Sequence, residues 1–267
     1  MIRVASVILG AWVALALVAL AWPDAVVNLD QALALPGSPH CPFGCDALGR
    51  PLGRLIAEGA LTALIIGTGT VLLAGTAGVV LGAGAALVGG WLEQVVMRIT
   101  DVLLAFPGIL LAIAITAVAG PGRMTIIVAL SITGWTGYAR LARGETLRLR
   151  ESAFVEAARV AGAPRAAILY RHILPNLLAP VTVQATFAFA GAVIAESSLS
   201  FLGLGDPTAA SWGSLLAEGV RHLRAAPHLS VIPGLVISAV VLALNLAGDA
   251  LTERFDPRRE TAAGQPG

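Results

Sequence analysis

The feature that most constrains this chain is a stretch, residues 59–92, that contains no Asp, Glu, Lys or Arg. About 20 mostly apolar residues are enough to cross a bilayer as a helix, so this stretch must tilt or protrude beyond the bilayer. Only 12% of the whole chain is charged and 57% is hydrophobic, whereas soluble domains carry about 25% charged residues. Membrane lipid is therefore the main solvent, and an unusually apolar soluble domain is a poor alternative.

Six segments are apolar enough to be membrane-spanning helices, which predicts an all-α integral membrane protein: residues 4–22, 59–92, 102–119, 124–139, 177–204 and 231–247. The first has a signal-peptide alternative, because Arg3 precedes it and Ala19 and Ala21 resemble a cleavage site, but its length favours an uncleaved anchor. We expect residues 1–58 to form this anchor and a periplasmic loop, residues 59–256 a transmembrane core, and residues 257–267 a disordered tail.

The arginines predict how the chain is oriented in the membrane. All 17 residues counted as Lys or Arg are arginine, and placing the N-terminus inside puts twelve of them on the inner side and five on the outer side. Cytoplasmic loops carry the excess of basic residues. Both termini and the polar segment 143–175 are therefore expected in the cytoplasm. The net charge of +1 gives no broad basic surface for nucleic acid.

The polar segment contains an ordered stretch, EAARVAGAPRAAILYRHILP, at residues 156–175. It predicts two short helices: Ser152 caps the first, Gly162 ends it in a left-handed conformation, Pro164 suits the first turn of the second, and Pro175 stops the second. A helix lying on the membrane surface is the alternative, but such a helix needs bulky apolar anchors. The small alanines favour close docking against a partner.

The stretch resembles the "EAA" loop of ABC-importer permeases, in which Glu-Ala-Ala is followed three residues later by Gly and further on by Leu-Pro. The RHILPN run at 171–176 resembles the peptide/nickel branch of that family, with His172 as its mark. The FGCDALGR run at 43–50 is similar to the branch's FGTD-x-x-GRD segment, except that Cys45 replaces Thr and Pro51 replaces Asp. Five further runs match the branch: DVLLAFP at 101–107, GWTGYAR at 134–140, AESSLSFLGLG at 195–205, SWG at 211–213 and NLAGD at 245–249.

The resemblance implies a type I ABC-importer permease fold, of the second or C-type subunit, that forms half of a translocation pathway for peptides, nickel or related small solutes. It implies three kinds of partner: a second homologous permease, two cytoplasmic ATPase subunits that bind ATP and Mg, and a periplasmic or lipid-anchored substrate-binding protein. The chain itself is not expected to be an enzyme or to hold a cofactor or metal. Dipeptides, oligopeptides, nickel, opines and glutathione all remain open as substrates.

Three groups of candidate residues follow from the resemblance. The residues expected to dock onto the ATPase are Glu156, Ala157, Ala158, Gly162, Pro164, Leu174 and Pro175. The gate or pore candidates are Glu196, Ser197 and Pro107, and the candidates for facing the substrate-binding protein are Asp46, Arg50 and Trp212. An acid inside a span is costly and marks a functional candidate, and for Glu196 a structural or gate role is favoured over binding substrate.

Several alternatives stay open. An ion-coupled secondary transporter would carry inverted repeats and binding residues at mid-membrane, which the sequence lacks, and a membrane scaffold without transport is the other class. Cys41 and Cys45 form a disulfide, remain thiols, or bind a metal with His40. Gly78 and Gly82 form a GxxxG pair, which predicts close helix packing.

Overall fold

The computed structural model describes residues 2–22 and 26–255, so the expected tail at 257–267 lies outside the described residues. Within those ranges the fold is helical, and β-structure is limited to two isolated bridges, Ser38–Cys41 and Cys45–Pro51. The elements are α1 (Ile2–Ala21), η1 (Leu29–Gln31), α2 (Leu52–Val88), α3 (Gly90–Leu104), α4 (Gly108–Ala119), α5 (Arg123–Arg150), α6 (Ala153–Val160), α7 (Arg165–Ile168), the π-helical turn η2 (Leu169–Ile173), α8 (Leu174–Phe201), α9 (Trp212–Arg221) and α10 (His228–Phe255).

By length and composition, four helices of the described chain can cross a membrane, or five if one bent pair counts as a span. The four are α1, α2, the joined helix from α7 to α8 (Arg165–Phe201), and α10, and the bent pair is α3 with α4. The predicted segment 124–139 lies in α5, whose 28 residues are long enough, but its arginines and glutamate make it less apolar. The sixth span and the sides on which the termini lie stay predictions.

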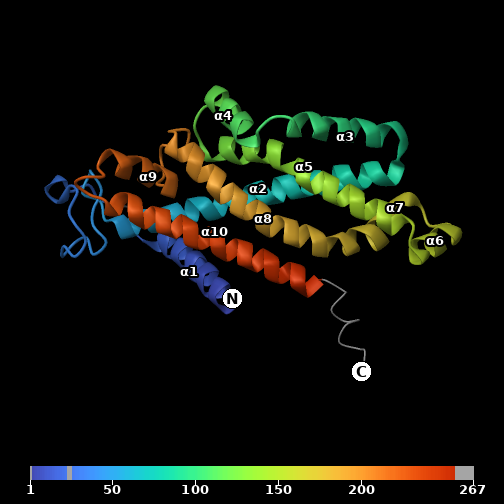
Figure 1. Ribbon diagram of the computed structural model, residues 1–267, viewed down its shortest axis with the longest axis horizontal. Coiled ribbons are helices and arrows are strands. Elements are labelled where there is room, and N and C mark those ends of the chain that lie inside the picture. Colours follow the sequence, from blue (N-terminus) through green and yellow to red (C-terminus); the bar gives the residue numbers. More distant parts are fainter. Residues whose placement is uncertain (1, 23–25, 256–267) are drawn as a thin grey trace.

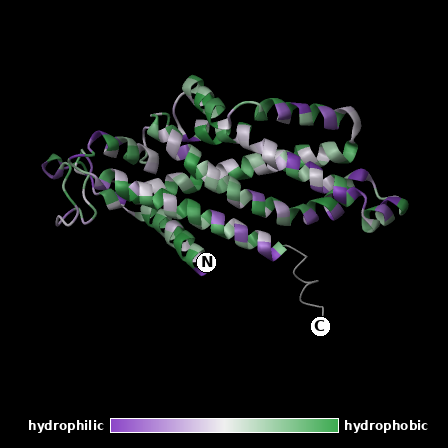
Figure 2. Ribbon diagram, viewed as in Figure 1, coloured by the Kyte–Doolittle hydropathy of each residue, from purple (hydrophilic) through white to green (hydrophobic). Residues whose placement is uncertain are grey.

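The long helices lie side by side as a bundle, with α1 against α2 and α10, and with α3 and α4 beside α5 (Figure 1). One end carries α6 and α7, and the opposite end carries the loop 26–51 and α9. We call these the inner and outer ends, after the orientation that the arginines predict. Hydrophobic residues dominate the bundle, while polar residues gather near α6, in the outer loop and along α3 (Figure 2).

Helices α2 and α5 approach each other closely at the predicted GxxxG pair. A Cβ added to Gly82 would lie 2.8 Å from the Cα of Ala139, and one added to Gly78 would lie 2.5 Å from the Cβ of Tyr138. Real Cβ atoms essentially never approach other atoms so closely. The contact therefore requires glycine at both positions, and the packing role predicted for this pair is confirmed.

Two tryptophans fix the outer end of the bundle. Trp212, at the start of α9, is 1% exposed and donates its indole N–H to the carbonyl oxygen of Ile56 at 3.0 Å. Trp12 of α1 donates to the carbonyl oxygen of Ala60 at 3.2 Å, and the two indole rings lie 6.3 Å apart. Gly59 leaves room for Trp212, whose Nε1 would lie 2.8 Å from an added Cβ. Helices α1, α2 and α9 are thereby joined.

The outer loop is tied by a disulfide between Cys41 and Cys45, both of which are buried. This decides among the alternatives for these cysteines, because cysteines joined as a disulfide offer no thiolate to a metal. The next residue, Asp46, is fully buried and accepts hydrogen bonds from the backbone N–H groups of Leu48 and Arg50 at 3.0 and 2.7 Å. Its other oxygen pairs with Nε of Arg50 at 2.6 Å, so Asp46 holds the loop in shape.

Candidate functional site

Within the coupling segment, residues 143–175, α6 forms a short helix at the inner end of the bundle. Gly162 has φ of +80°, the left-handed conformation predicted for it. Its N–H donates to the carbonyl of Arg159 and that of Ala163 to the carbonyl of Ala158, each at 3.0 Å. This pair of bonds is the Schellman motif, which satisfies the last carbonyls of a helix.

The predicted hydrogen bond that would cap the N-terminus of α6 does not form. Ser152 occupies the N-cap position, but its hydroxyl makes no cap hydrogen bond and donates instead to the carbonyl of Leu149 in the preceding helix. The residue therefore links α5 to α6 rather than capping α6. Sequence alone gives the position of this serine but not which of two nearby backbone groups its hydroxyl prefers.

Three apolar side chains attach the coupling segment to the bundle. Val155 and Ile173 are fully buried and Ile168 is 3% exposed, and they pack in one cluster with Ala142 and Leu149 of α5. Burial of side chains of this size contributes roughly 1.5–3 kcal/mol each. The segment is therefore held on one side and uncovered on the other.

The uncovered side carries most of the residues predicted to dock. Glu156, Ala157, Gly162, Pro164 and Pro175 are exposed, and Ala158 and Leu174 are half-buried. Glu156 pairs with Arg159 at 3.2 Å across one helical turn, and Val160 beside them is 82% exposed. A large exposed apolar side chain next to small residues suits contact with another protein.

The prediction that Pro175 stops the second helix is wrong. The chain runs as one helix of 37 residues from Arg165 to Phe201, with the π-helical turn η2 just before Pro175. A proline inside a helix loses one hydrogen bond and crowds the carbonyl of the preceding turn, and a π turn changes that local pairing. The side-chain amide of Asn176 then donates to the carbonyl of His172 at 2.7 Å. The second helix is thus the inner end of a membrane-spanning helix.

Glu196 lies near the outer end of α8 and is 1% exposed. Its carboxylate accepts hydrogen bonds from the hydroxyls of Ser200 at 2.7 Å and Ser197 at 3.4 Å. Helix α9 presses against this turn, since a Cβ added to Gly213 would lie 2.7 Å from the carbonyl carbon of Ser197. These contacts fit the structural role favoured for Glu196, at the junction of α8 and α9.

Pro107 stands at the break between α3 and α4, whose axes differ by 86°. The break agrees with the kink predicted for this span, because proline cannot continue the hydrogen bonding of α3. It turns α4 across the bundle beside α5. The bend positions the first turn of α4 at the edge of the groove described below.

Two of the three residues expected to face the substrate-binding protein do not lie on the surface. Asp46 and Trp212 are buried, so this expectation is corrected for both: Asp46 organises the outer loop and Trp212 anchors α9. Arg50 alone is partly exposed, with 30% of its side chain accessible. Asp46 lies within a polar loop and Trp212 directly follows one, so the local sequence does not indicate that either side chain is buried.

Arg50 instead borders an outer polar cavity of about 470 Å³, which sequence analysis missed. Glu58, Asp206 and Glu218 line the same cavity, and Glu218 accepts a hydrogen bond from the N–H of Ala47 at 2.9 Å. The hydrogen bond from the Thr208 hydroxyl lowers the pKa of Asp206. These residues come from three separate stretches of sequence, so no local motif reveals them.

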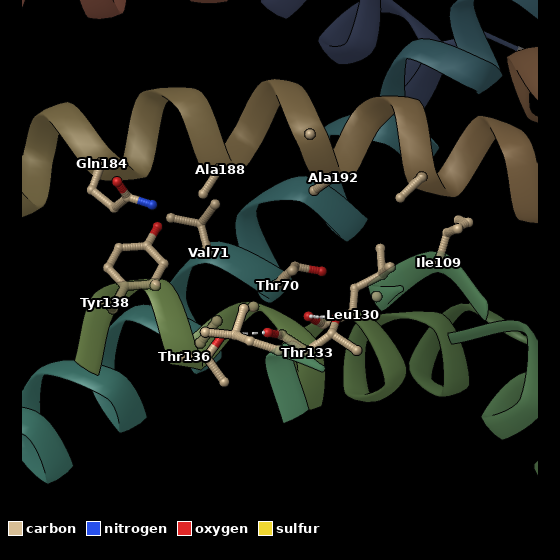
Figure 3. Close-up of a pocket in the computed structure, with 17 residues that line it drawn as sticks. Thr70, Val71, Ile109, Leu130, Thr133, Thr136, Tyr138, Gln184, Ala188 and Ala192 are labelled. Atoms are coloured by element: carbon tan, nitrogen blue, oxygen red, sulfur yellow. Dashed lines mark hydrogen bonds between the residues drawn. The ribbon is translucent and has the colours of Figure 1, made fainter. Parts of the chain in front are cut away.

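A second feature that sequence analysis missed is the α5–α8 groove, a cavity of about 380 Å³ within the bundle (Figure 3). Residues of α2, α4, α5 and α8 line it. The polar groups that face it include Thr70, Thr136, Tyr138 and Gln184, and the side chains of Tyr138 and Gln184 point toward one another. Apart from these groups and Thr133, the walls are made of small and apolar residues.

A bundle of long apolar helices with an exposed helical segment at one end has the architecture of a multi-pass membrane protein. The chain belongs to the family described as the binding-protein-dependent transport system inner membrane component, whose model matches residues 78–261. It is 43% identical over 217 residues to the glutathione transport system permease protein GsiD of Escherichia coli O6:K15:H31 (strain 536 / UPEC), covering 81% of this chain and 72% of that protein. It is 44% identical, with the same coverage, to GsiD of Shigella flexneri serotype 5b (strain 8401).

A solved structure shows the same fold. The chain is similar to one in the inward facing MetNI methionine ABC transporter, with a TM-score of 0.57, 18% identity, and coverage of 74% of this chain and 96% of that chain. The protein is thus a permease subunit of an ABC importer in the peptide/nickel family and a multi-pass protein of the bacterial inner membrane. Such a subunit works with a partner permease, ATPases and a substrate-binding protein.

Proposed function

We propose that this chain forms one half of a solute pathway and that the exposed side of its coupling segment seats on an ATPase subunit. The observation that carries the proposal is the one-sided attachment of that segment: Val155, Ile168 and Ile173 are buried, while Glu156 and Ala157 are exposed. The second half comes from a related permease, so the pathway is a heterodimer served by two ATPases.

The coupling is mechanical. ATP binding closes the two ATPase subunits, and a segment seated on one of them must move with it. Shifting a two-state gate from 1:99 to 99:1 takes about 5.5 kcal/mol of differential binding, which paired ATP sites can supply. ATP and Mg bind to the partner subunits, and this chain carries out no hydrolysis.

The outer end receives solute from the substrate-binding protein. The outer polar cavity, with Arg50 at its edge and Glu58, Asp206 and Glu218 in its walls, is the surface that we assign to this contact. In this arrangement residues 1–58 form the anchor and outer loop, residues 59–256 form the core, and both termini lie in the cytoplasm.

The solute is a peptide or a peptide-like compound. The proteins of known role that this chain matches at 43–44% identity are named as glutathione permeases, and glutathione is a small peptide. Nickel and opines are the alternatives that the family resemblance leaves. Selection among peptides rests largely with the substrate-binding protein.

The docking assignment is tested by co-purification of the importer through a tag on this chain. Ala157→Trp places a bulky side chain on the exposed side of α6, and Glu156→Lys reverses the charge there. Both variants are therefore expected to lose the ATPase subunits. Ala225→Trp is the matched control, since Ala225 is also an exposed alanine but lies at the outer end between α9 and α10. Retention of the ATPases by both α6 variants would refute the assignment.

A further inference from the structure

The α5–α8 groove contains polar groups that the protein leaves unused. Tyr138 is 1% exposed, yet its hydroxyl has no hydrogen-bond partner in the described chain, and neither has the hydroxyl of Thr70 in the same wall. Leaving a buried hydroxyl unpaired is unfavourable, because the group loses its hydrogen bond to water and gains none from the protein. A site that tolerates this cost has a reason to keep the hydroxyl available, and a solute that pairs with it recovers the loss.

Gln184 lies opposite Tyr138 across the groove (Figure 3). Its amide makes no hydrogen bond to the described protein, and one amide offers both donors and an acceptor. Gln184 also lines a second cavity of about 650 Å³ at the inner end, where Glu145 and Arg148 form an ion pair at 2.7 Å. Gln184 therefore lies between the α5–α8 groove and the cavity at the inner end.

The chemistry of the groove selects a class of solute. None of its 17 lining residues is Asp, Glu, Arg, His or Cys. A bare divalent cation such as Ni²⁺ needs imidazole, thiolate or carboxylate ligands, and this wall provides none. An uncharged donor and acceptor pair matches the N–H and C=O of a peptide group, each of which requires a partner away from water.

We propose that Tyr138 and Gln184 form a solute-contact site inside the membrane that hydrogen-bonds the peptide group of the transported compound. The inference rests on the proposed function, because it needs a working importer. To that function it adds where in this subunit the solute is contacted and which kind of bond it makes there. The hydroxyl of Tyr138 is covered in the present conformation, so neighbouring side chains must move to uncover it when solute passes.

Water access along the groove is the first test. Gln184→Cys and Ala188→Cys, in the complete importer and in membrane vesicles, are treated with a charged, membrane-impermeant methanethiosulfonate reagent. Leu242→Cys is the control, since Leu242 is an apolar residue of α10 that is 58% exposed and does not line the groove. The groove positions are expected to react at least tenfold faster than position 242, and equal rates at all three positions would overturn the proposal.

Uptake by the reconstituted importer is the second test, with radiolabelled glutathione and dialanine as probes. Tyr138→Phe, which removes only the hydroxyl, is expected to raise KM about two- to tenfold, the effect of one hydrogen bond between uncharged groups. Gln184→Leu is expected to do the same. Ser238→Ala removes a hydroxyl of α10 that bonds only the carbonyl of Gly234, and its KM should equal that of the unaltered importer.

The outcomes separate this inference from the proposed function. If the unaltered chain fails to bring down ATPases, the proposed function falls. If it forms an ATP-driven importer but Tyr138→Phe and Gln184→Leu transport both peptides with an unchanged KM, only the contact site falls. Uptake of Ni²⁺ by the unaltered importer, with neither peptide transported, would overturn the peptide chemistry assigned to the groove.

Discussion

Replacing Gly82 by alanine tests how closely α2 and α5 must pack. The added Cβ would lie 2.8 Å from the Cα of Ala139, whereas carbon atoms prefer a separation of about 3.5–4.0 Å. The two helices must therefore separate by about 1 Å at this point. Overpacking of this kind costs about 1–3 kcal/mol, partly offset by the gain of up to about 1 kcal/mol that alanine brings to a helix interior.

Gly84→Ala is the matched control on the same helix. Gly84 lies two residues further along α2, and an added Cβ meets nothing within 4 Å. The helix-propensity gain is common to both variants, so the difference between them isolates the contact of α2 with α5. Gly84→Ala is expected to be as stable as the unaltered chain or slightly more stable.

The assay is the apparent melting temperature of the detergent-solubilised permease, read from the folded fraction on size exclusion after heating. A change of 1 kcal/mol corresponds to roughly 2–4 °C for a chain of this size, so the variant at 82 should melt about 2–12 °C below the variant at 84. Equal melting temperatures would show that α2 and α5 do not need this close approach, and would refute the reasoning.

Three further predictions concern the outer end. Glu196→Ala should lower the melting temperature by the equivalent of about 1–3 kcal/mol, because two serine hydroxyls lose their acceptor; Glu196→Gln keeps an acceptor and should retain most of the stability. The lowered pKa of Asp206 means that its carboxylate stabilises the loop after α8 fully above the ordinary pKa of 3.8, and that this contribution is lost as pH falls through the lowered value. The protection factors of that loop's amides, corrected for the intrinsic pH dependence of exchange, should therefore fall on acidification, and Asp206→Asn should remove this fall. Thiol titration of the denatured protein should find no free thiol before reduction and two afterwards, from Cys41 and Cys45; two thiols without reductant would contradict the disulfide.

Sequence alone predicts the features that depend on local composition. The uncharged stretch 59–92 lies largely within α2, which spans 37 residues, because lipid accepts only a helix whose backbone groups are paired. Gly162 takes its predicted left-handed conformation because no other residue adopts it so easily. In both cases the interactions that decide the conformation lie within a few helical turns of the residue concerned.

The features that sequence misses depend on distant partners. Trp212 is buried because Gly59 and Trp12, far earlier in the chain, make a place for it. Pro175 remains in a helix because the π-helical turn before it changes the backbone pairing at the point where its N–H is missing. The α5–α8 groove is assembled from uncharged residues on separate helices, and no short motif marks such a surface.

The continuous helix from Arg165 to Phe201 gives the protein a long lever, with the π-helical turn η2 and Pro180 within it. At 1.5 Å per residue its 37 residues extend roughly 55 Å, with the coupling segment at one end, Gln184 near the middle and Glu196 close to the other end. A tilt imposed at the inner end moves the groove wall and the outer junction at the same time. If the pivot lies between them, the two move in opposite directions. We expect this one helix to link opening on one side of the membrane to closing on the other, with no relay of side chains between the two faces.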